Sequence, residues 1–139
     1  MAVVMCTVGC SASAEVTGVK LSVSHSVNIC CMHVSAVKSE DGTFMLSGYI
    51  YDTDGNIYET TDGFQMSADG VERLLSVTRG DMEPYPKSPK FHADDAPVKK
   101  LEITYSDGRK ELFSVTETME TGLREIFLNE FKDSCPAGH

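Results

Sequence analysis

The segment that decides the fold covers residues 43–61 and reads TFMLSGYIYDTDGNIYETT. Its first half alternates Phe44, Leu46 and Ile50 with more polar neighbours, which is the two-residue period of a strand with one buried face. The Asp-Gly-Asn sequence at 54–56 then predicts a tight reversal, because Asp-Gly pairs accept positive φ at little cost. The segment therefore predicts two neighbouring antiparallel strands of a meander.

The same alternation predicts further strands on both sides of this segment. Upstream it covers residues 19–24 and 29–37, and downstream residues 100–105 and 109–115 read as a hairpin around Ser106-Asp107-Gly108. Four of the five prolines lie between Gly80 and Val98, so this stretch is predicted to be a long loop.

Two stretches change to the period of a helix. Ser67 is a suitable N-cap for the first, in which Val71, Leu74 and Leu75 form one apolar stripe. The second covers residues 119–132 and repeats apolar side chains at Leu123, Ile126, Phe127 and Phe131. This order of elements predicts an α+β domain, with an antiparallel sheet of about five strands (meander plus C-terminal hairpin) and two helices packed on one face.

Length and charge limit the classes of function. The chain has 139 residues and a formal net charge of −9, so it has room for one hydrophobic core and lacks the basic surface that nucleic acid requires. We expect no nucleic-acid partner and a single domain at 18–133, with a leader and tether at 1–17 and a tail at 134–139.

The first residues predict export. An uncharged apolar run at residues 1–9 is too short to span a bilayer, but it has the length of the apolar region of a signal peptide. The sequence Thr7-Val8-Gly9-Cys10 resembles a bacterial lipoprotein box, which implies a lipid on Cys10 and a membrane anchor for the domain. The alternative is a first strand in a domain that is not exported.

Two phrases carry a wider resemblance. The sequences at 41–49 (DGTFMLSGY) and 101–109 (LEITYSDGR), followed by a terminal amphipathic helix, resemble uncharacterised small exported domains of Gram-positive anaerobes. The likeness covers roughly residues 19–132. It implies an exported α+β domain at the cell membrane or cell surface, and it brings no catalytic residues.

Cysteine and histidine supply the only candidate chemistry. Cys31 and His33 share a strand face and could hold a metal with His25 or His92, or act as a Cys-His nucleophile pair. The paired Cys-x₂₋₄-Cys clusters of structural zinc sites are absent, which favours a buried Cys31 that acts as a small hydrophobe. We therefore expect no metal and no cofactor. Cys135 could pair with Cys30 or Cys31, or all three could remain free thiols.

The proline-rich loop is a candidate binding edge. It combines aromatic and basic side chains, in the one cluster of positive charge on an acidic chain: Tyr85, Lys87, Lys90, Phe91 and His92. The alternative is that Tyr85 and Phe91 close the open end of the core. Together these features predict a non-enzymatic, exported, lipid-anchored envelope domain with a binding or structural role, whose expected partner is an envelope protein or a glycan. The alternative is a small thiol- or metal-dependent enzyme that uses Cys31 and His33.

Overall fold

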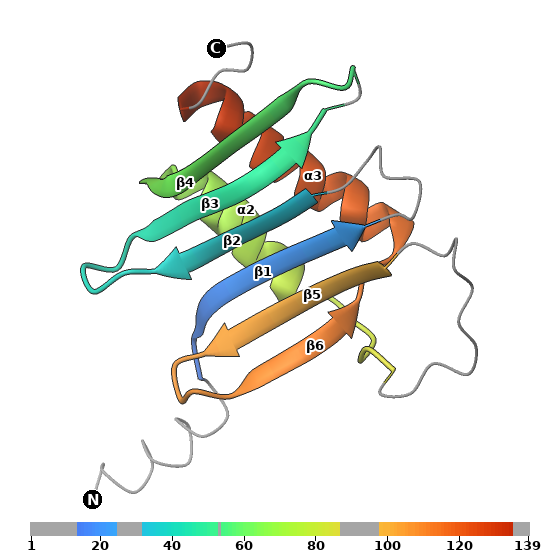
Figure 1. The fold of residues 1–139 in the computed structure, drawn as a ribbon. Coiled ribbons are helices and arrows are strands. Elements are labelled where there is room, and N and C mark those ends of the chain that lie inside the picture. The colour runs from blue at the N-terminus through green and yellow to red at the C-terminus, as the bar shows by residue number, and fades with distance from the viewer. Residues whose placement is uncertain (1–13, 25–31, 53, 87–97, 135–139) are drawn as a thin grey trace, which may run out of the picture.

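The computed structural model describes residues 14–24, 32–52, 54–86 and 98–134. They form an open antiparallel sheet of six strands, and both helices lie on the same face of it (Figure 1). The predicted α+β class is confirmed. The sheet has six strands where the sequence predicted about five, because the meander supplies four strands and the C-terminal hairpin two.

The strand order in the sheet is β4-β3-β2-β1-β5-β6. The first strand therefore lies inside the sheet, and the later strands lie on either side of it. The meander consists of β1 (Val16–Ser24), β2 (Met32–Lys38), β3 (Phe44–Tyr51) and β4 (Ile57–Gln65). Helix α2 (Ala68–Thr78) returns the chain to the other side of β1, where β5 (Val98–Tyr105), β6 (Lys110–Ser114) and α3 (Glu117–Ser134) follow. As a result β1 pairs with β2 on one side and with β5 on the other.

The core lies between the sheet and the helices. Alternation along β1 turns Val19, Leu21 and Val23 toward the helices, and all three are buried. Across the layer, α3 contributes Phe127 and Phe131, both fully buried, and the Phe131 ring meets Phe64 of β4 edge to face at 5.2 Å between centroids. The apolar stripe predicted for the last helix is therefore the face that packs on the sheet.

The two edges of the sheet differ. The outer edge of β6 is covered by residues 83–85, where the Tyr85 N–H donates to the Leu112 carbonyl (2.9 Å) and the Ser114 N–H to the Glu83 carbonyl (2.8 Å). The β4 edge has no such cover in the described part of the chain, but a register shift opposite Ser47 and the charged Asp62 interrupt it. Such irregularities hinder edge-to-edge pairing of sheets.

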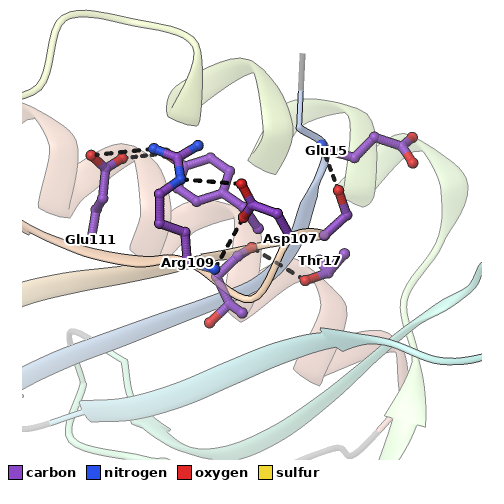
Figure 2. A network of polar contacts seen from close by, with 8 residues as sticks. Glu15, Thr17, Asp107, Arg109 and Glu111 are labelled. Atoms are coloured by element: carbon purple, nitrogen blue, oxygen red, sulfur yellow. Dashed lines mark hydrogen bonds and ion pairs between the residues drawn. The ribbon is translucent and has the colours of Figure 1, made fainter. Parts of the chain in front are cut away.

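The folded body begins before the predicted domain boundary at residue 18. Val16 already pairs with Tyr105, and the Thr17 hydroxyl donates to the Thr104 carbonyl at 3.3 Å. Glu15 joins the β5–β6 turn through two hydrogen bonds. Its N–H donates to Ser106 Oγ at 3.2 Å (Figure 2), and its carbonyl accepts from the Ser106 N–H at 2.7 Å. In the same turn Arg109 contacts Asp107 and Glu111. The small and polar residues of this stretch gave no local signal for these pairings, because the partner strand is distant in the sequence.

The β2–β3 turn gives a pH prediction. Asp41 accepts hydrogen bonds from the Ser39 and Thr43 hydroxyls, both at 2.7 Å, and these together with the Thr43 N–H lower the pKa of Asp41 to about 2. Because the folded pKa lies below the ordinary value of 3.8, this contribution to stability is present above that pH and is lost as the pH falls toward about 2. A carboxyl-detected NMR titration should show a midpoint near pH 2 for Asp41. Ser39→Ala should raise it, whereas Ser35→Ala, in the middle of β2, should leave it unchanged.

Candidate functional site

The structure describes two of the side chains that the sequence singled out, Tyr85 and His33. Both have exposed or partly exposed side chains. The other candidates lie outside the described residues, and so do the histidines and cysteines considered with them: Cys10, Cys31, Lys87, Lys90, Phe91, His92, His25, Cys30 and Cys135. The predicted lipidation site, Cys10, and the cysteine of the predicted Cys31–His33 pair therefore lie outside the described part of the fold.

Tyr85 lies at the edge of the sheet, not at an open end of the core. The backbone bonds of residues 83–85 to β6 fix its position, and Lys100 Nζ lies over its ring at 5.7 Å from the centroid. A cation at this distance from an aromatic face is attracted by the ring quadrupole. Because Lys100 points to the face of the sheet away from the helices, the Tyr85 ring lies on that same side.

No helix of the described residues lies on this second face of the sheet, which we call the open face (Figure 1). Its composition follows from the strand period, because each strand that sends apolar residues to the helices sends the alternate residues outward. On β2, for example, Met32, Val34 and Ala36 are buried, while His33 and Val37 are exposed.

One line of open-face residues crosses all six strands. Each member pairs with the next through the strand register, from Ser114 on β6 to Glu59 on β4. We call this line the transverse row; in order it consists of Ser114, Lys100, Ser22, His33, Tyr49 and Glu59. At a strand spacing of about 4.8 Å, the row is about 24 Å long.

Aromatic rings gather in the β2–β3 half of the open face. The His33 and Tyr49 rings lie 5.4 Å apart between centroids with a tilt of 57°, and Tyr51 meets Tyr49 edge to face at 6.3 Å. Both tyrosines are half-buried and His33 is exposed, so each ring keeps part of its surface toward solvent. Sequence reasoning singled out His33 for metal or nucleophile chemistry but did not find this cluster, because the β2–β3 register that joins His33 to Tyr49 was unknown.

The open face also holds the exposed apolar side chains. The large hydrophobics of the described residues that are most exposed are Val37, Ile57, Val98 and Leu112, between 39% and 54% accessible. Residues that pair directly across two strands lie on the same face of a sheet. Each of these four side chains pairs with a residue that points away from the helices, as Ile57 does with Tyr51 and Leu112 with Glu102. A face that combines apolar and aromatic surface with polar groups is typical of a binding surface.

The charge of the open face differs from that of the whole chain. Its paired positions carry Lys20, Lys100 and Lys110 against Glu59 and Glu102. The exposed Glu83, which lies opposite Ser114 on the same side as Tyr85, balances the third lysine, so the face has no net charge on a chain of net charge −9. Lys110 and Glu102 lie 4.0 Å apart, so part of this charge is paired on the face itself. The acidic groups are therefore concentrated on the rest of the molecule.

A concave region lies between the start of α2 and the end of α3. This cleft has a volume of about 350 Å³, and Ser67, Gly70, Ile126 and Glu130 are among the residues that line it. The Glu130 carboxylate is buried there and accepts from the Ser67 N–H (2.8 Å) and hydroxyl (2.6 Å). Because these groups satisfy one another, the cleft is a junction that holds the two helices together.

An ionic cluster joins α3 to the end of the sheet at which β3 ends and β5 begins. Glu120 binds Lys99 of β5 at 2.7 Å and Arg124 at 3.0 Å, and Arg124 Nη1 donates to the Tyr51 carbonyl at 2.7 Å. Burial raises the pKa of Glu120, but the hydrogen bonds from Lys99 and Arg124 outweigh it and leave this pKa below its usual value. All three side chains are paired, which fits a structural role.

Comparisons with known proteins give no match, whether with protein-family models, with curated proteins or with solved structures. Within the described ranges, no group of three or more His, Cys, Asp or Glu side chains could hold a metal ion. No helix in the same part of the chain is both long and apolar enough to cross a membrane.

Proposed function

We propose that the protein is a non-enzymatic domain of the bacterial cell envelope, exported and held at the membrane by a lipid on Cys10. In this proposal it binds a partner in the envelope through the open face of its sheet. The proposal combines the lipoprotein-box sequence Thr7-Val8-Gly9-Cys10 with the one-sided architecture of the fold.

The observation that carries the binding role is the asymmetry of the sheet. Its helix side is closed by a packed core, whereas the open face presents His33, Tyr49 and Tyr51 together with exposed apolar side chains. Exposed apolar and aromatic groups gain free energy when a partner removes them from water, and for this reason such groups mark interaction sites. A partner that covers the face accounts for their presence.

The anchor would also set the orientation of the domain. Four residues lie between Cys10 and Glu15, where the chain joins the β5–β6 turn, so the five residue-to-residue steps of a fully extended chain reach about 18 Å. The end of the sheet with the β2–β3 and β5–β6 turns would then lie near the membrane (Figure 1). Because the strands would run away from the membrane, the open face would stay accessible from the side.

Metabolic labelling tests the anchor. In cells of the native host fed with radiolabelled palmitate, we expect label on the wild-type protein and its loss in Cys10→Ser, which should also move the protein from the membrane to the soluble fraction. Cys30→Ser is the matched control and should keep the label. An unlabelled wild type, or label that persists in Cys10→Ser, would contradict the lipid anchor.

A further inference from the structure

We infer that the transverse row binds a neutral, linear glycan that lies across the strands of the open face. This inference rests on the proposed use of that face for binding and names the class of partner. It follows from the length of the row, the groups along it and the charge around it.

The shape of the row suits an extended chain. Its six positions lie on six adjacent strands, so successive side chains repeat at the strand spacing of about 4.8 Å along a line of about 24 Å. Tyr85 adds an aromatic ring beside Lys100 at one end of the line. A ligand with repeating units can therefore meet one side chain per strand, which a compact small molecule cannot do.

The groups in the row match the chemistry of sugars. A sugar ring has apolar C–H faces and a rim of hydroxyls, so it needs aromatic surface together with hydrogen-bond donors and acceptors. Tyr49 and His33 supply partly exposed rings, Ser22 supplies a hydroxyl, and Lys100 and Glu59 supply a donor and an acceptor at opposite ends. Ser35 and Ser47, which pair across the neighbouring line of the same face, add two further hydroxyls.

The charge favours a neutral glycan over other extended polymers. The face carries three basic and three acidic side chains, of which Lys110 and Glu102 are paired, and the chain as a whole carries −9. An anionic polymer such as a nucleic acid or a sulfated glycan would gain little from the face and would be repelled by the rest of the molecule. The hydroxyls and aromatic rings of the face can contact an uncharged ligand, and the acidic groups of the chain do not repel such a ligand.

The test uses the full chain with Cys10→Ser, so that no detergent is needed. It is titrated with three neutral hexasaccharides (N-acetylchitohexaose, cellohexaose and mannohexaose), with their trisaccharides, and with heparin as an anionic control. We expect at least one hexasaccharide to bind, more tightly than its trisaccharide, and NMR shifts on binding to lie along the transverse row. Tyr49→Ala should weaken binding by about three- to tenfold, while Tyr49→Phe keeps the ring and most of the affinity. Glu125→Ala, on the exposed side of α3, is the control and should bind as the parent does.

Several outcomes would overturn the inference. They are no binding of any neutral hexasaccharide, tighter binding of heparin, or NMR shifts that lie away from the open face. Self-association that Tyr49→Ala abolishes would assign the face to a second copy of the chain instead. These results are independent of palmitate labelling, so a labelled protein that binds no glycan would refute this inference and leave the anchor in place.

Discussion

Gly48→Ala is expected to lower the free energy of unfolding by about 4 kcal/mol, the largest effect of an added methyl group at any glycine of the described residues. Gly48 lies on β3 opposite Val34 with φ of 118°, a backbone conformation that side chains rarely adopt. A Cβ at this position would overlap the His33 carbonyl oxygen and would lie 2.9 Å from the His33 carbonyl carbon. Because that carbonyl belongs to the neighbouring strand, relief requires the β2–β3 pairing to open.

Urea denaturation monitored by circular dichroism measures this effect. Alanine substitutions at two other glycines distinguish the backbone strain from the overlap with His33. Gly55, in the β3–β4 turn, has φ of 88° but open space around it, so Gly55→Ala should cost only the backbone strain, about 1–2 kcal/mol. Gly122 lies within α3 and a Cβ there meets nothing within 4 Å, so Gly122→Ala should stabilise by up to about 1 kcal/mol. If Gly48→Ala cost no more than Gly55→Ala, the close approach to His33 would not be the cause.

Gly48 also illustrates what the sequence could predict and what it could not. The alternation of Phe44, Leu46 and Ile50 predicted β3 and its buried face correctly, because that pattern is local. The Ser67 N-cap and the Phe127 and Phe131 stripe were predicted for the same reason. The need for glycine at 48 depends on how β3 lies against β2, and register between strands is not encoded by the period of either strand alone.

The candidate site was less accessible to sequence reasoning for the same physical reason. His33 and Tyr85 were singled out as separate residues, one for metal or nucleophile chemistry and one for a loop. The structure places them on one face with Tyr49 and Lys100, which are 16 and 15 residues from them in the sequence and come together only through strand pairing. Outward-pointing Ser, Tyr and Lys at alternate positions were the available signal, and this pattern is shared by any solvated strand.

The second large effect is expected at the junction of α2 and α3, where Glu130→Ala should cost about 3 kcal/mol. Two groups of the N-cap residue Ser67 donate to the buried Glu130 carboxylate, and the Ser67 hydroxyl in turn accepts from the Gly70 N–H at 3.0 Å. Removal of the carboxylate leaves the Ser67 N–H without its partner and takes a negative charge from the start of a helix. Glu130→Gln keeps one acceptor oxygen and should cost less, about 1–2 kcal/mol.

Gly70→Ala tests this prediction, because its effect on the free energy of unfolding should change sign when Glu130 is removed. A Cβ at Gly70 would overlap Glu130 Oε2 and lie 2.8 Å from Glu130 Cδ, so Gly70→Ala alone should destabilise by about 1–3 kcal/mol. In the Glu130→Ala background that overlap is gone, and alanine is the better helix former by about 1 kcal/mol, so the same substitution should become neutral or stabilising. Urea denaturation of the four proteins in this double-mutant cycle measures the coupling. If the effects of Gly70→Ala and Glu130→Ala on the free energy of unfolding were additive, Glu130 would not be the reason why residue 70 is glycine.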